Sequence, residues 1–177
     1  MKLLKKTPVA ILIMVVVILA SGLLGCRRSL LSERKSAEDL FYSGESIQND
    51  LEYIGATAGN LKTIALRYMD ADDLLITDLN DARSALTSAK SISEKYEAAQ
   101  RLFDAVTNVH DALDPNKMNS TDKSFRASLY DDIKSAMQRI SHSDYNDKAR
   151  EFNELLEHYP AKLIADVVGI EPIQLYG

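Results

Sequence analysis

The chain has 177 residues, no tryptophan and one cysteine, and its formal net charge at neutral pH is −5. The first 25 residues contain three lysines and no acidic residue, so the rest of the chain carries 18 basic and 26 acidic side chains and a charge of −8. This acidic balance argues against a nucleic-acid partner, and a single cysteine excludes a disulfide or a cysteine-based metal site within one chain.

The N-terminal region is dominated by an uncharged run over residues 7–26, with lysines before it and two arginines after it. In a helix that rises about 1.5 Å per residue, such a run covers the roughly 30 Å hydrocarbon core of a bilayer. It therefore predicts attachment to a membrane through the N-terminus.

Two forms of attachment fit this run. Residues 23–26, Leu-Leu-Gly-Cys, resemble the lipobox of bacterial lipoproteins, in which a signal peptide is cleaved before an acylated cysteine. Cys26 is then the candidate lipid-attachment residue. An uncleaved transmembrane helix has the same length and the same flanking cations. In both cases we expect the anchor over residues 1–26, a juxtamembrane linker over 27–35 and one domain over 36–177.

The rest of the chain has the composition of long helices, because glycine and proline are sparse and alanine, leucine and charged residues dominate. Apolar residues recur at alternating steps of three and four in three stretches, residues 37–58, 61–89 and 92–113. This spacing places one narrow apolar stripe on each helix, as in coiled-coil-like bundles.

Capping and turn residues predict where these helices begin and end. A loose capping signal at Ser36 begins the first helix, and Gly55 with residues 58–60, Ala-Gly-Asn, marks a turn or kink before the second. Ser91 and Glu94 form a capping box for the third helix. The polar segment 114–122 is a loop, and Pro160 ends the fourth helix. We expect a short helix and a packed tail over 161–177. The predicted fold is all-α: an antiparallel four-helix bundle of long helices behind the membrane anchor.

The last long helix carries more than helical periodicity. Aromatic residues recur every seven positions and an asparagine follows each of the first two; the residues are Tyr145, Asn146, Phe152, Asn153, Tyr159 and Pro160. This pattern resembles the C-terminal signature of the LemA family. Asn60-Leu61 and the Ala-Arg-Ser-Ala of residues 82–85 also resemble elements of that family. The resemblance, to a divergent member, implies an N-terminally anchored helical bundle with no established catalytic activity.

Several polar groups allow a functional and a structural interpretation. Residues 141–144, Ser-His-Ser-Asp, have the side chains of a hydrolase triad, but four consecutive residues do not converge as a triad must. Glu154 and His158 are one turn apart, yet no Glu-x-x-His pair of a di-iron bundle occurs in the chain. His110 is expected at the edge of the core. We therefore predict no catalytic residue, metal ligand or cofactor-binding residue, and no enzyme.

Asn146 and Asn153 each lie one position after an aromatic residue of the stripe. Two interpretations are open: they are polar residues that flank the stripe, or their amides reach a neighbouring helix and set its register. The acidic residues 70–73 form a solvated helix face or a docking patch for a basic partner.

These observations favour a non-enzymatic adaptor or scaffold, anchored in the cell envelope with the bundle outside the cytoplasm and bound to an envelope protein not identified by the sequence. The main alternative is a sensor domain with a small molecule between its helices, in a gap near Gly44, residues 58–59 or Asp72. An enzyme ranks third.

Overall fold

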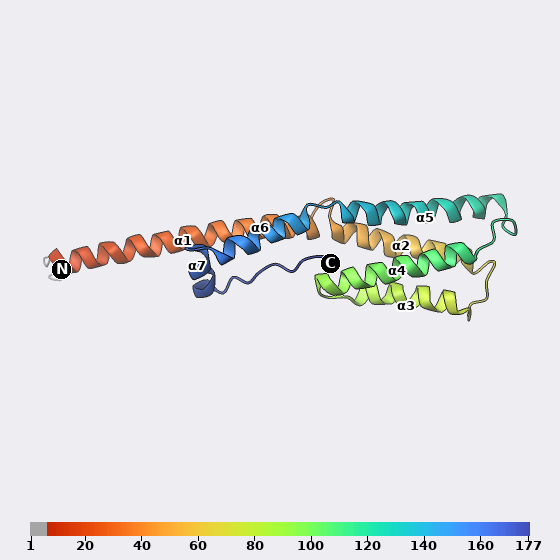
Figure 1. Cartoon of the computed structure of the whole chain (residues 1–177), viewed down its shortest axis with the longest axis horizontal. Coiled ribbons are helices and arrows are strands. Elements are labelled where there is room, and N and C mark those ends of the chain that lie inside the picture. Colours follow the sequence, from red (N-terminus) through yellow and green to blue (C-terminus); the bar gives the residue numbers. More distant parts are fainter. Residues whose placement is uncertain (1–6) are drawn as a thin grey trace. The chain divides into compact units, whose positions relative to one another are not determined.

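The computed structural model describes residues 7–177 and is entirely helical (Figure 1). Of these residues 78% lie in helices and none in a strand, which confirms the all-α prediction. The described helices are α1 (Thr7–Tyr42), α2 (Ile47–Ala65), α3 (Leu74–Ser88), α4 (Ile92–Ala112), α5 (Ser120–Ser141), α6 (Tyr145–Glu157) and α7 (Ala161–Val168).

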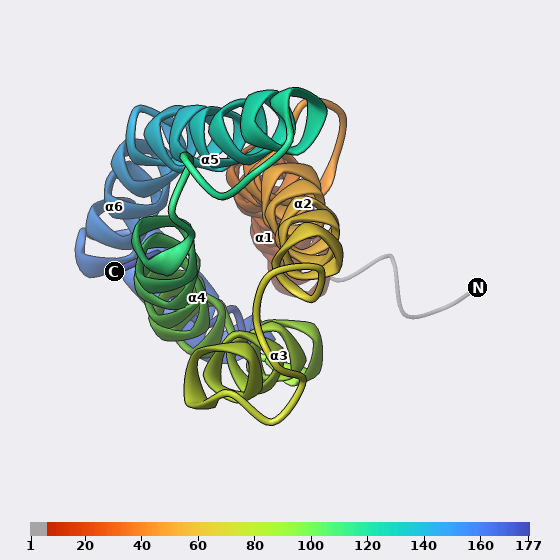
Figure 2. The ribbon, with the colours of Figure 1, turned by 90° about the vertical axis from the view of Figure 1, so that its right-hand side faces the viewer.

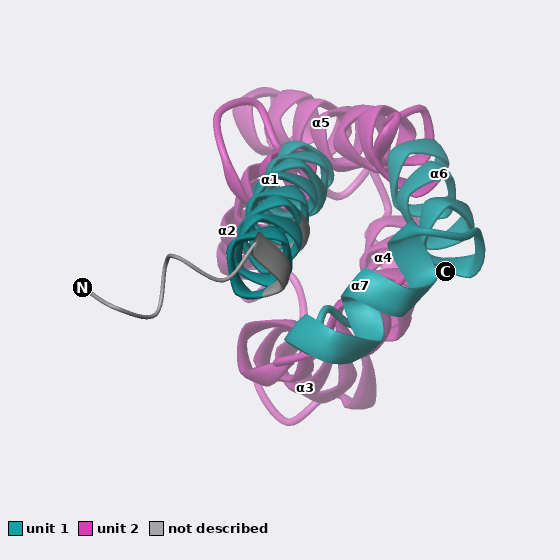
Figure 3. Ribbon diagram, turned by 90° about the vertical axis from the view of Figure 1, so that its left-hand side faces the viewer, with its two compact units in different colours: residues 1–37, 147–173 teal, residues 38–146, 174–177 magenta. Residues whose placement is uncertain are grey.

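The chain divides into two compact units, coloured separately in Figure 3. Unit 1 combines the N-terminal part of the chain up to Ala37 with residues 147–173. Unit 2 comprises residues 38–146 and 174–177. Helices α2 to α5 belong wholly to unit 2, and α7 belongs wholly to unit 1.

Unit 2 is built around the apolar stripes of four helices. Helix α2 packs against α5 and α3, and α4 packs against α3 and α5, as the end-on view in Figure 2 shows. Every helix contributes side chains that solvent does not reach; the largest are Ile54, Leu61, Leu79, Leu102, Val106, Val109 and Ile133. Burial of each such side chain stabilises the fold by about 1.5–3 kcal/mol, so these stripes are the main source of stability in unit 2.

In unit 1, buried apolar side chains come from all three of its helices; they are Leu30 and Ala37 of α1, Ala149, Phe152 and Leu156 of α6, and Ile164 and Ala165 of α7. Arg34 Nη1 also donates a hydrogen bond of 3.0 Å to the carbonyl of Glu171. On α1, the side chains of residues 11–18 and 20–29 are all exposed, and Leu30 is the first buried one. The covered part of α1 therefore begins at Leu30.

The predicted linker over residues 27–35 is wrong, because α1 continues through it to Tyr42. Residues 27–42 contain neither glycine nor proline, so nothing in them ends the helix. The break comes instead at Gly44, whose positive φ of 67° suits glycine. The following helix, α2, begins after Ser46, whose hydroxyl accepts from the Asn49 amide.

The turn predicted at residues 58–60 is also wrong, because these residues lie inside α2. A Cβ atom on Gly59 would lie 2.7 Å from Nη2 of Arg83, and Arg83 Nε donates a 2.9 Å hydrogen bond to the Gly55 carbonyl. Gly59 therefore makes room for an arginine of α3 rather than for a turn. The real break, residues 66–73, ends where the Asp73 carboxylate caps α3 by accepting from the Leu75 amide at 2.8 Å.

The predicted fourth helix is in fact two helices, α5 and α6. The break falls at residues 142–144, where the apolar phase of the sequence slips by one position. Other predicted features agree with the structure. The capping box of Ser91 and Glu94 is formed at the start of α4, and residues 161–177 form a short helix followed by a tail with buried Ile170, Ile173 and Tyr176.

Candidate functional site

In unit 2, Asn146 holds the main chain of the C-terminal tail. Its Nδ2 donates to the carbonyl of Tyr176 at 2.8 Å, and its Oδ1 accepts from the amide of the same residue at 2.8 Å. One side-chain amide thus satisfies both polar groups of a tail residue, as a neighbouring β-strand would.

In unit 1, Asn153 makes the same pair of bonds with Ile173. Nδ2 donates to the Ile173 carbonyl at 2.9 Å, and Oδ1 accepts from the Ile173 amide at 2.8 Å. We call these two pairs the asparagine clamps.

The clamps have matched spacings along the chain. Asn146 and Asn153 are seven residues apart in α6, which is about 10.5 Å of helix at 1.5 Å per residue. Ile173 and Tyr176 are three residues apart, and about 10 Å separates such residues in an extended chain. A helix and an extended tail can therefore form both clamps without strain in either backbone.

An aromatic cluster in unit 2 surrounds the end of the tail. The Tyr145 hydroxyl donates to the Gln174 carbonyl at 2.6 Å. The Phe41 ring centroid lies 5.2 Å from that of Tyr145, and the Tyr176 ring lies 5.2 Å from that of Tyr96 in an edge-on arrangement. These contacts, added to the clamp, bury Tyr176 so that only 8% of it is exposed.

The Tyr176 hydroxyl is buried and has no hydrogen-bond partner among residues 7–177. Burial in apolar surroundings raises the pKa of Tyr176 well above the usual value for a phenol. This tyrosine therefore stays neutral at physiological pH and acts as an apolar ring in the cluster.

The six motif residues do not all lie in one place. Tyr145 and Phe152 are buried, the two asparagines form the clamps, and Tyr159 is 84% exposed. Helix α6 ends at Glu157, so Tyr159 no longer follows the helical stripe, and Pro160 occupies the N-cap position of α7.

Both asparagines reach across to another segment, as expected, but that segment is the extended tail and not a neighbouring helix. The sequence does not identify Ile173 and Tyr176 as partners of the asparagines, because the clamps bind their main-chain atoms and not their side chains. The only signal for them is the spacing of three between Ile170, Ile173 and Tyr176 in a tail without helical character.

A second polar network of unit 2, away from the tail, is centred on a buried carboxylate. Asp122, in the first turn of α5, is only 1% exposed. It accepts from Arg67 Nη1 at 2.5 Å, from the Tyr68 hydroxyl at 2.7 Å and from Asn119 Nδ2 at 2.8 Å. The hydrogen bond from Tyr68, with those from Arg67 and Asn119, lowers the pKa of Asp122 below its usual value. This network ties the end of α2 to the start of α5.

The three histidines lie in separate places in the structure. The His110 ring stacks on Tyr130 with centroids 4.2 Å apart, and its carbonyl accepts two hydrogen bonds from Arg126. His142 caps the end of α5, where its Nδ1 lies 2.8 Å from the Gln138 carbonyl. His158 is exposed.

The Ser-His-Ser-Asp segment is the connection between α5 and α6. The hydroxyl of Ser143 accepts from the Tyr145 amide at 3.3 Å, and Ser141 bonds back to the Gln138 carbonyl at 2.8 Å. Within residues 7–177, no cluster of three or more His, Cys, Asp or Glu side chains is arranged to hold a metal ion.

An open cleft of about 610 Å³ lies beside Gly44 in unit 2, between the start of α2 and the last turns of α5. Arg139 on one wall forms an ion pair with Asp50 on the other; Nε of Arg139 is 3.1 Å from Oδ1 of Asp50. This bond raises the pKa of the Arg139 guanidinium. Tyr53 and Asp132 also line the cleft.

The remaining predicted groups lie elsewhere. The acidic residues 70–73 occupy the connection between α2 and α3, so they form no helix face, and one of them is the α3 cap. Cys26 is exposed on α1. Among the described residues one helix, α1, is long and apolar enough to cross a membrane, and none of the qualifying segment is buried; a signal sequence near the N-terminus has the same length and composition.

Comparison with known proteins agrees with the family resemblance carried by the residues of α6. No curated protein matches the chain. The family model described as the LemA family matches residues 45–177, which include every described helix except α1. The chain therefore belongs to the LemA family.

Proposed function

We propose that this LemA-family protein is a membrane-anchored, non-enzymatic adaptor or scaffold of the cell envelope. The observation that carries the proposal is the uncovered apolar segment of α1, where exposed fractions run from 44% to 63% between residues 11 and 18. Exposed apolar surface of this extent is stable in lipid and unfavourable in water. In this proposal α2 to α5 form one antiparallel four-helix bundle outside the cytoplasm.

Support for a non-enzymatic role comes from what the reactive side chains already do. Asp122 accepts three side-chain hydrogen bonds, His142 caps a helix, and the clamp asparagines bind main chain. These groups stabilise the fold, and a buried polar network that is fully satisfied gives rigidity rather than reactivity. A rigid helical surface suits a scaffold.

Acyl labelling tests the anchor. Cells that express the wild type or Cys26→Ala are given a labelled fatty acid, with Ser21→Ala as the control for a small change in the same segment. Label in the wild type and in the control but not in Cys26→Ala supports a lipoprotein. An unlabelled full-length product that stays in the membrane fraction supports an uncleaved span, and a wild-type protein found in the soluble fraction contradicts the anchor.

Cross-linking in intact cells tests the adaptor role. A photoreactive residue is placed at exposed positions on each face of unit 2, for example at Phe125 and Leu74. We expect one face to give a discrete cross-linked product that the other faces do not give. Substitutions on that face should abolish this product. Equal background labelling at every position would contradict the adaptor.

The cleft beside Gly44 favours a second function, a sensor that binds a small polar molecule. Its volume of about 610 Å³ is that of a ligand site, and it lies beside Gly44, where the apolar stripe of the sequence is thin. A thermal-shift screen against metabolites tests this function. A hit should lose its effect in Ser135→Trp, which fills the cleft from an exposed position, and should keep it in Ser128→Trp, an exposed position of α5 outside the lining.

A further inference from the structure

Helix α7 exposes apolar side chains despite its small size. Leu163 is 53% exposed and Val167 is 67% exposed, and these residues are one turn apart on the same side of the helix. Ile164 and Ala165 occupy the buried side. Tyr159, 84% exposed, precedes the helix. Helix α7 thus has a second apolar face that no described residue of unit 1 covers.

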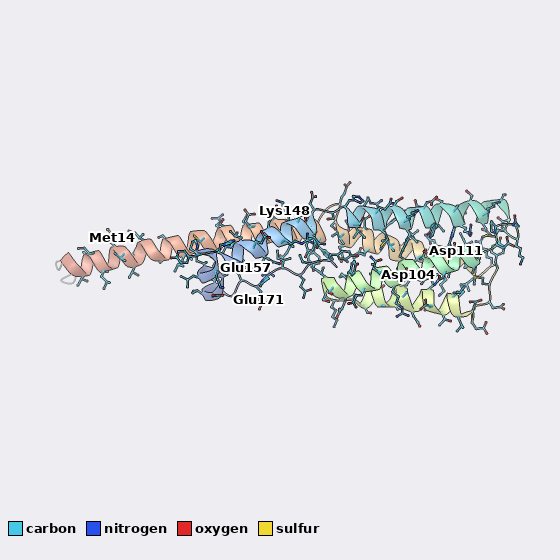
Figure 4. All side chains as sticks on the ribbon, in the orientation of Figure 1. Met14, Asp104, Asp111, Lys148, Glu157 and Glu171 are labelled. Carbon is cyan, nitrogen blue, oxygen red and sulfur yellow. The ribbon has the colours of Figure 1, made fainter. Side chains whose placement is uncertain are left out.

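The location of this face within unit 1 indicates what covers it. Figure 4 shows Met14 on the part of α1 that projects beyond the other helices of unit 1, and Glu157, at the end of α6, on the side of the unit toward that projection. Helix α7 follows Glu157 after three residues. It therefore lies at the end of unit 1 from which the apolar segment emerges, at the level where α1 first becomes covered.

We propose that the α7 face formed by Tyr159, Leu163 and Val167 is a second membrane contact, seated in the headgroup region of the bilayer that α1 enters. The proposal rests on the membrane anchor proposed above, because the anchor brings unit 1 to the lipid surface. The apolar surface of α1 ends at Cys26, Arg27 and Arg28 follow it at the level expected for lipid headgroups, and α7 lies just beyond them in the same unit.

The chemistry of these residues fits a lipid headgroup region. A tyrosine with an apolar ring and a polar hydroxyl is typical of that layer, and leucine and valine on one helix face sit about 5–10 Å into the boundary between headgroups and acyl chains. Lys162 and Asp166 flank the face with opposite charges. Because these charges balance, contact should occur on zwitterionic phosphatidylcholine and should not require anionic lipid.

The absence of tryptophan from the chain allows a direct test. The full chain is purified from membranes and reconstituted into phosphatidylcholine vesicles as Leu163→Trp, Val167→Trp or Phe125→Trp. Phe125 is the matched control, because it is 54% exposed, like Leu163, but belongs to α5 in unit 2. Each variant then has one tryptophan, and Cys26 remains unchanged.

Two readouts separate this proposal from the anchor on which it rests. Flotation of the vesicles reports the anchor, and quenching by lipids brominated at known depths reports the position of the tryptophan. We expect all variants to float, with blue-shifted emission and loss of intensity at positions 163 and 167, strongest for lipids brominated near the headgroup. Position 125 should be unaffected.

If all variants float and positions 163 and 167 are not quenched, the α7 contact is refuted and the anchor stands. If position 125 is quenched equally, the contact is not specific to α7 and the proposal also fails. Protein that does not float refutes the anchor and the α7 contact together. An unchanged thermal midpoint in each variant shows that the exposed substitutions leave the fold intact.

Discussion

Removal of the clamp at Asn146 should release the end of the tail while leaving the helices in place. Asn146→Leu keeps the branched heavy-atom skeleton of the side chain, with methyl groups in place of the amide atoms, and removes both hydrogen bonds to Tyr176. Each hydrogen bond contributes about 1 kcal/mol net, so the free energy of unfolding should fall by about 2 kcal/mol. In a chain of this size that loss lowers the thermal midpoint by about 4–8 °C.

The assay combines thermal denaturation with amide hydrogen exchange. The Tyr176 amide should lose its protection in Asn146→Leu, while the Ile173 amide, held by Asn153, keeps it. Helicity should stay near that of the wild type, and the transition should become less cooperative. Asn108→Leu, at an exposed position of α4, controls for the general effect of leucine in place of asparagine. A protected Tyr176 amide and an unchanged midpoint in Asn146→Leu would refute the clamp.

Three further outcomes are expected in unit 2. Because the pKa of Asp122 is lowered by folding, its carboxylate stabilises the fold above the unfolded pKa of about 3.8. The midpoint of Asp122→Asn should therefore lie below that of the wild type by a constant amount at neutral pH, and the gap should close as pH falls below this value; a constant gap down to pH 2 would contradict the network. Ser91→Ala removes the α4 cap, so its free energy of unfolding, measured by urea denaturation, should be about 1 kcal/mol lower than that of the wild type. Leu102 is fully buried, so Leu102→Ala leaves a cavity and should lower the free energy of unfolding by about 2–5 kcal/mol. A decrease below about 1 kcal/mol would contradict a core position for Leu102.

The helical stripes could be predicted from sequence because local spacing alone determines them. Ile92, Ala99, Val106 and Leu113 recur at sevens and all prove to be buried. The capping box at Ser91 was equally predictable, since both its bonds are made within four residues.

The errors fall where a residue serves a partner that is distant in sequence. Gly59 is a turn signal by composition, but its missing side chain makes room for Arg83, which is 24 residues away. The acidic run before α3 has the charge of a solvated face, yet Asp73 serves as a cap. The asparagine clamps were predicted only in part, because they bind main-chain atoms of the tail, and main-chain atoms are the same at every position.

The unbroken path of α1 from Cys26 to Leu30 has a consequence for how the protein would search for its partners. These residues are four apart, so about one helical turn, or 6 Å, separates the candidate acylation site from the first packed side chain. A protein acylated there has no flexible linker between the acyl chains and the first packed residue, so it would meet a partner in or on the same membrane by lateral diffusion. Its association would then depend on surface density rather than on volume concentration, so affinities measured in solution would understate its occupancy in the cell.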